Sequence, residues 1–105
     1  MKIKVWGCRG TLPTPGVHTL KYGGNTTCLE IHNKDGFPII IDAGSGMRYL
    51  GKQIMQNNGC DELCLMLTHS HWDHLMGFPF FMPAYFSRFK INVCGYQSAR
   101  HYMCQ

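Results

Sequence analysis

Acidic side chains are scarce in this sequence. The 105 residues contain six Asp and Glu against ten Lys and Arg, and charged residues make up only 15% of the chain. The formal charge of +4 favours anionic partners, but there is no basic run of the kind that marks a dedicated nucleic-acid binder. Hydrophobic residues reach 45%, which supplies enough apolar surface for a core and excludes a disordered chain.

Long apolar runs are also missing. No segment approaches the ~20 apolar residues that a membrane span requires. The amino end alternates Met-Lys-Ile-Lys and lacks the apolar run of a secretory signal. We therefore expect a soluble, cytoplasmic protein with no membrane partner.

The six cysteines do not form a tight C-x2-C pair. Cys60 and Cys64 are four residues apart and the others are scattered singly, which argues against a structural zinc site built from thiolates. In a reducing cytoplasm we expect buried free thiols, since free cysteine behaves as a small hydrophobic residue.

Length and periodicity predict one small mixed domain, residues 1–105. Met47 to Gln56 has apolar residues at helical spacing, followed by the helix stop Asn57-Asn58-Gly59. Short helical turns are predicted within Phe78 to Phe89, which two prolines interrupt, and a last helix is predicted from Gln97. Five stretches have the alternating or continuous apolar pattern of strands, the second and third forming a hairpin: Lys2 to Trp6, Asn25 to His32, Phe37 to Asp42, Leu63 to Leu67 and Lys90 to Gly95.

Four potential metal ligands follow the predicted strand Leu63 to Leu67 within seven positions: His69, His71, Asp73 and His74. Side chains two apart in extended backbone point the same way, so the imidazoles of His69 and His71 are expected on one side. Imidazole and carboxylate together suit zinc, manganese or ferrous iron. With no thiolate nearby, the pattern indicates an open catalytic site, and the alternative is a chance grouping of histidines.

These residues carry a family resemblance. Residues 68–74, Thr-His-Ser-His-Trp-Asp-His, resemble the H-x-H-x-D-H signature of the metallo-β-lactamase superfamily of metal-dependent hydrolases. Asp42, at the end of an apolar strand and followed by Ala-Gly-Ser-Gly, resembles the Asp of the family's first motif. Gly7 to Thr11 and Tyr22 to Thr27 resemble the phosphodiesterase-type and tRNA 3′-processing nuclease branch. The similarity covers nearly all of the chain and corresponds to the family's N-terminal half only.

The resemblance implies an α/β fold, the N-terminal half of a four-layer αββα sandwich with a mixed β-sheet and flanking helices. It also implies two divalent metal ions, zinc first and manganese or iron as alternatives. His69 and His71 would bind one ion, and Asp73 and His74 the other. Asp73, a carboxylate near a helix amino end, is also the candidate catalytic residue, binding metal or steering the attacking water. Asp42 would not bind metal itself but would orient a metal ligand or a backbone amide. The alternative is a simple turn-forming residue.

The expected reaction is hydrolysis of a phosphodiester, such as a cyclic nucleotide or RNA, by a two-metal-activated water. Hydrolysis of a thioester, lactone or lactam is the alternative. Family members add a further His, a bridging Asp and a last His. These are not found here, because His101 is interpreted as an ordinary helix residue. We therefore expect incomplete metal sites and no activity of the chain alone.

The alternative to an enzyme is that the chain is a non-catalytic fragment or remnant that binds metal weakly or pairs with another chain. A homodimer or a complementing chain would use the sheet face left uncovered.

Two weaker features remain open. Asn25, after Gly23-Gly24, is a candidate for contacting a substrate phosphate, although a Gly-Gly turn entering a strand has the same appearance. An aromatic cluster after the signature is interpreted as core, with a base-stacking platform as the alternative. Its members are Phe78, Phe80, Phe81, Tyr85, Phe86 and Phe89.

Overall fold

A computed structural model describes residues 1–34, 36–56 and 61–95 of the chain. Its centre is a five-stranded mixed sheet whose strand order follows the sequence, β1-β2-β3-β4-β5. The β1/β2 and β2/β3 pairs are antiparallel, and the β3/β4 and β4/β5 pairs are parallel. The strands are β1 (Lys2–Gly7), β2 (Cys28–His32), β3 (Ile39–Ile41), β4 (Glu62–Leu67) and β5 (Lys90–Gly95). This confirms the mixed α/β sheet expected for part of a metallo-β-lactamase fold.

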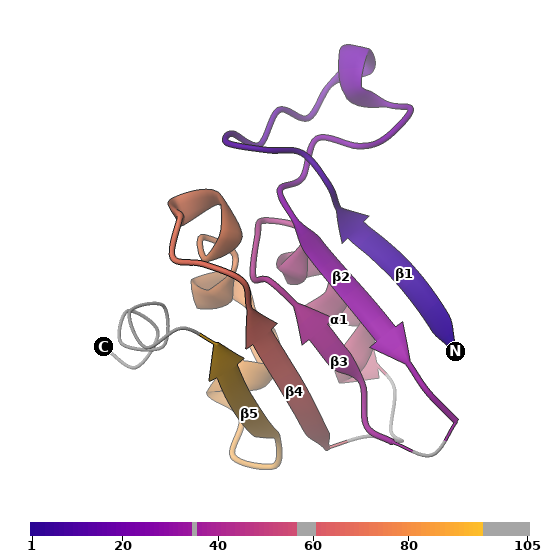
Figure 1. Cartoon of the computed structure of the whole chain (residues 1–105), viewed down its shortest axis with the longest axis vertical. Helices are drawn as coiled ribbons and strands as arrows, with labels where there is room; N and C mark the ends of the chain where they lie inside the picture. The colour runs from indigo at the N-terminus through magenta and orange to yellow at the C-terminus, as the bar shows by residue number, and fades with distance from the viewer. Residues whose placement is uncertain (35, 57–60, 96–105) are drawn as a thin grey trace.

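One helix, α1 (Met47–Gln56), covers one face of the sheet (Figure 1). Of the four apolar side chains at helical spacing, Met47, Leu50 and Ile54 are buried and Met55 is partly buried against the core, as the periodicity predicts. They pack with Ile40, Leu63, Leu65 and Leu67 of the sheet in one core. Gly51 lets the helix lie close to the segment 81–83, because a Cβ there would lie 3.0 Å from the Phe81 ring.

Three short 3₁₀ helices follow β4, and the last two lie in the segment 78–89 where the two prolines predict helical turns. They are η2 (Trp72–His74), η3 (Phe78–Phe80) and η4 (Met82–Tyr85). A fourth, η1 (Val17–Thr19), lies in the loop between β1 and β2, which extends beyond the sheet at the top of Figure 1. That loop is at the same end of the sheet as the carboxyl ends of β3, β4 and β5.

The strand predictions hold in position and differ at their ends. β2 begins at Cys28 and not at Asn25, because Asn25 and Thr26 bind the loops around them. β3 is restricted to Ile39–Ile41, and Asp42 leaves the strand with a φ of 64°. The predicted helix from Gln97 lies outside the described residues. No helix within the described ranges is long and apolar enough to cross a membrane.

No helix among the described residues covers the other face of the sheet, called the bare face below, which is largely apolar apart from Glu62, Lys90 and Asn92 near one edge (Figure 1). Three of its side chains are strongly exposed for their type: Ile3 at 57%, Val5 at 56% and Met66 at 45%. By strand pairing this face also carries Leu29, Ile31, Ile39, Ile41, Cys64 and Cys94. An exposed apolar patch of this kind marks a surface suited to association.

The expectation that the cysteines are buried thiols is correct for Cys28 and wrong for two others. Cys28 is fully buried in the core, whereas Cys8 and Cys94 are exposed and Cys64 is half-buried. Cys60 and Cys104 lie outside the described residues. Cys8 is exposed because it follows β1 into the protruding loop, and Cys94 because it points to the bare sheet face.

We predict that the thiols differ sharply in reactivity. Burial, followed by the nearby charges of Glu30 and Asp42, raises the pKa of Cys28 to about 12, so almost no reactive thiolate exists at pH 8. Timed alkylation of the folded protein with iodoacetamide, mapped by mass spectrometry, should label Cys8 and Cys94 early and Cys28 only after unfolding. Early labelling of Cys28 in the folded protein would contradict this placement.

Candidate metal centre

The candidate ligands lie where two parallel strands end. β4 ends at Leu67, and His69 to His74 follow it directly; β3 ends at Ile41, and Asp42 follows at once. Carboxyl ends of parallel strands meet at one edge of a sheet, where functional groups from separate segments converge. The topology therefore brings Asp42 beside the histidine segment, although they are far apart in sequence.

The imidazole rings of the segment gather in one cluster. The centroid of the His69 ring lies 4.6 Å from that of His71 and 4.1 Å from that of His74. His71 is exposed, whereas His69 and His74 are half-buried. The extended backbone thus places His69 and His71 as their spacing predicts, and the turn at Trp72–His74 returns His74 to the same group.

Asp42 is the anchor of this cluster. Its carboxylate is buried and accepts hydrogen bonds from the Thr68 backbone N–H at 2.8 Å, from the Thr68 hydroxyl at 2.8 Å and from Nδ1 of His74 at 2.9 Å. A proton on Nδ1 of His74 fixes the tautomer that leaves Nε2 with a lone pair. An Asp tolerates the left-handed backbone that this position requires better than most residues do.

Asp73 is held from the other side by the β1–β2 loop. Its Oδ2 accepts a hydrogen bond from the Thr11 backbone N–H at 3.0 Å and lies 3.3 Å from Nε2 of His74. The Thr11 hydrogen bond is the main reason that the pKa of Asp73 is lowered, with the charges of His74 and His71 adding to it. The prediction that Asp73 remains a carboxylate agrees with this shift. Its first cause is the Thr11 amide, and not the helix end that the sequence suggested.

Thr11 is a residue that the sequence analysis missed, and its backbone is strained. Its φ is 70°, in the left-handed region that β-branched residues avoid. The strain accompanies a contact to a candidate functional residue, where such conformations concentrate. In the sequence Thr11 is only the last residue of the segment Gly7 to Thr11 that carries part of the family resemblance, which does not reveal a partner 62 residues away.

Replacing Thr11 with glycine is expected to stabilise the fold. Glycine keeps the N–H and adopts a positive φ freely, so relief of strain exceeds its larger unfolded-state entropy by about 0.5–1 kcal/mol. Urea unfolding measures the change. Ser87→Gly, in an exposed turn without a positive φ, is the control and should lose stability slightly. A Thr11→Gly variant no more stable than Ser87→Gly would contradict the strained conformation.

The loop after the histidines is joined to the loop after β3 through backbone contacts. The Ala43 N–H donates to the His74 carbonyl at 2.7 Å, and the Gly77 N–H donates to the Ala43 carbonyl at 2.8 Å. Gly77 lies so close that a Cβ there would meet the Gly44 carbonyl oxygen at 1.9 Å. Gly77 is therefore needed for the close approach of the two loops, a role that its place after the histidine motif signals only weakly.

Comparison with known protein families gives one match. Residues 11–88 match the metallo-beta-lactamase superfamily, a span that includes Asp42, the histidine segment and Thr11. The chain belongs to this superfamily. No curated protein and no solved structure matches it in the corresponding comparisons.

Membership supports the coarser part of the prediction, a metal-dependent hydrolase in a superfamily whose members generally bind divalent metal ions. The chemistry of the donors in this superfamily member fits such an ion, since three imidazoles and a carboxylate lie together. Within the described part of the chain, however, no three His, Cys, Asp or Glu side chains stand ready to hold one metal. The three rings are nevertheless clustered, because Asp42 holds both the Thr68 backbone and the His74 ring, and Nε2 of His74 faces the carboxylate of Asp73.

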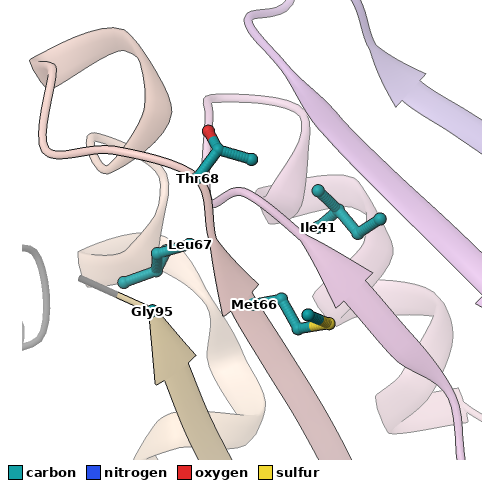
Figure 2. Close-up of a pocket in the computed structure, with 5 residues that line it drawn as sticks. All are labelled: Ile41, Met66, Leu67, Thr68 and Gly95. Atoms are coloured by element: carbon teal, nitrogen blue, oxygen red, sulfur yellow. The ribbon is translucent and has the colours of Figure 1, made fainter.

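A cavity of about 550 Å³ opens beside the superfamily motif. It lies at the carboxyl ends of β3, β4 and β5 and is lined by Ile41, Met66, Leu67, Thr68 and Gly95 (Figure 2). Thr68 joins this cavity to the cluster, because its hydroxyl lies 2.9 Å from Nδ1 of His69 and 2.8 Å from Asp42. The cavity is thus an apolar space next to the candidate ligands.

Asn25 lies at a different place from the histidines. Its Oδ1 accepts a hydrogen bond from the Ser45 hydroxyl at 3.2 Å, and it lines a small cavity of about 200 Å³ shared with Arg48. None of the clustered histidines lines that cavity. The structure therefore places Asn25 on the α1 side of the chain, beside a cationic residue.

Proposed function

We propose that this chain provides half of a two-metal site for the hydrolysis of phosphodiesters, such as RNA or a cyclic nucleotide. The proposal rests on the hydrogen bonds that the buried Asp42 carboxylate accepts from both Thr68 and His74. A carboxylate that binds Nδ1 of a histidine fixes the orientation of the ring and leaves Nε2 free, an arrangement common around metal ligands.

The roles of the remaining residues follow from their chemistry. His69 and His71 would hold one ion, and Asp73 and His74 the other, zinc first and manganese or iron as alternatives. When bound, the two ions supply an activated water and polarise the attacked centre. The chain's own contribution is to orient the ligands and to keep Asp73 ionised through the Thr11 amide, so that it binds metal or orients water.

The net charge of +4 supports an anionic substrate, and the segments Gly7 to Thr11 and Tyr22 to Thr27 resemble the phosphodiesterase-type branch. A specific observation favours a second candidate, hydrolysis of a thioester, lactone or lactam. The cavity beside Thr68 is lined mainly by apolar side chains, and an acyl group would fit such a lining better than a phosphate would.

Two ligands per ion are fewer than the three that a catalytic zinc takes from protein, so the site needs further donors. We propose a second copy as the partner, because the bare face carrying Ile3, Val5 and Met66 suits another apolar surface. Sedimentation at rising concentration should reveal a dimer, and Met66→Lys should abolish it. Only monomer at high concentration would remove the homodimer.

The test of function is a rate comparison. Bis(p-nitrophenyl) phosphate, a thioester and a lactam are each offered with zinc or manganese, at several protein concentrations. We expect phosphodiester hydrolysis that rises faster than linearly with protein and falls at least roughly 100-fold in a His69→Ala/His71→Ala variant. Faster thioester or lactam cleavage would select the second candidate. No metal-dependent hydrolysis of any substrate would contradict both.

A further inference from the structure

A second cavity lies on the helix side of the molecule, away from the histidine cluster. It has a volume of about 430 Å³ and is formed between α1 and the η3–η4 segment. Its walls are Arg48 and Lys52 on one side, and Pro79, Phe80, Met82 and Tyr85 on the other. The volume is in the range of sites for small organic ligands.

The two cations of this cavity are available for a ligand. Arg48 and Lys52 are four residues apart, so they lie on the same side of α1, and both are exposed. Among the described residues neither side chain forms an ion pair or a hydrogen bond, and the ammonium of Lys52 lies only over the Tyr49 ring at 5.6 Å. The cavity lining contains no carboxylate.

Three of the chain's six acidic residues are engaged at other places in the structure. Glu30 is bound to Trp6 and His32 within the sheet, and Asp42 and Asp73 are held at the histidine cluster. None of these carboxylates lines the cavity, so its described lining is positively charged. An arginine beside a lysine supplies the fork and the point charge that bind a phosphate group.

The opposite wall is aromatic, open and fixed in place. Phe80 and Tyr85 are 66% and 67% exposed, so their rings are not used by the core. The Tyr85 hydroxyl donates to the Pro79 carbonyl, and the close approach at Gly51 sets the distance of this wall from α1. Exposed rings on a rigid support stack against planar bases, and this stacking tolerates any base.

We infer that this cavity binds a nucleoside monophosphate, its phosphate on Arg48 and Lys52 and its base against Phe80 and Tyr85. The inference goes beyond the proposed hydrolysis, because the cavity contains none of the proposed metal ligands. Arg48 and Phe80 also line the smaller cavity that holds Asn25, so a larger ligand has room to extend in that direction.

The test is calorimetric titration of the whole chain with adenosine monophosphate, adenosine and inorganic phosphate, in the presence of a chelator so that hydrolysis plays no part. We expect the monophosphate to bind at least tenfold more tightly than either part. An Arg48→Gln/Lys52→Gln variant should weaken it at least tenfold. Phe80→Ala should weaken the monophosphate about five- to 100-fold and leave inorganic phosphate unchanged.

The matched control is Lys2→Gln/Lys34→Gln, which also removes two positive charges, but from exposed positions outside both cavities. It should bind the monophosphate like the parent, as should the His69→Ala/His71→Ala variant. Absence of binding, or an equal loss in the cavity and control variants, would overturn the inference. Because no metal is present, either result is independent of whether the histidine cluster hydrolyses anything.

Discussion

Replacing Asp42 with alanine is expected to lower the free energy of unfolding by about 3 kcal/mol. The change leaves the Thr68 N–H and Nδ1 of His74 without their acceptor, and each partly buried donor left unpaired costs about 1–3 kcal/mol. Alanine also tolerates the φ of 64° less well. Asp42→Asn keeps one carbonyl acceptor and should lose about half as much.

Urea unfolding measures this loss, with Asp61→Ala as the control, since Asp61 is exposed and its side chain forms no contact among the described residues. The same variant should bind metal about 10- to 100-fold more weakly, because the orientation of His74 is lost. If Asp42→Ala and Asp61→Ala are equally stable and bind metal equally, Asp42 is not the anchor of the cluster.

Gly77→Ala should be nearly as damaging for a purely steric reason. Gly77 has an ordinary φ of −83°, so alanine is not excluded by its own backbone. Its Cβ would lie 1.9 Å from the Gly44 carbonyl oxygen, a backbone atom. The two loops that carry the site must therefore separate, with an expected loss of about 3 kcal/mol, at the upper end for an overpacked position.

Gly10→Ala is the matched control for this change, because a Cβ at Gly10 meets nothing within 4 Å and its φ is not positive. It should leave stability unchanged or raise it by about 0.4–1 kcal/mol through the unfolded state. Thermal unfolding of both variants, with circular dichroism to confirm the fold, gives the comparison. Equal stabilities would mean that the two loops do not approach closely.

Local patterns were sufficient to predict the elements of this fold. The spacing of Met47, Leu50 and Ile54 predicts α1, and the apolar runs predict all five strands, because burial on one face imposes a period on the sequence. Strand ends were less accurate. The side chain of Asn25 binds another loop, so this residue does not join the backbone hydrogen bonds of the sheet. No local pattern reveals such a contact.

The candidate site shows the same division. The four clustered residues are close in sequence, so their spacing alone predicts that they gather. Thr11 and Gly77 act through contacts between segments far apart in the chain, one through a backbone N–H and the other through the absence of a side chain. Neither role depends on side-chain chemistry, so sequence reasoning that searches for reactive groups does not find them.

The interpretation of the aromatic cluster as core is correct for only part of it. Phe81 and Phe89 are buried in the core, whereas Phe80, Tyr85 and Phe86 are exposed. The prolines explain the division, since they break the segment into short turns that cannot direct every ring to one side. Only the three-dimensional arrangement brings two of the exposed rings opposite Arg48 and Lys52.

The histidine segment is expected to hold metal, and equilibrium dialysis followed by elemental analysis tests this most directly. The 105-residue protein, a His69→Ala/His71→Ala variant and the exposed-histidine control His18→Ala are equilibrated with zinc, manganese or ferrous iron. We predict about one or two ions per chain in the parent and in His18→Ala, and a loss in the double variant. Equal metal content in all three proteins, or none in any, would contradict the account.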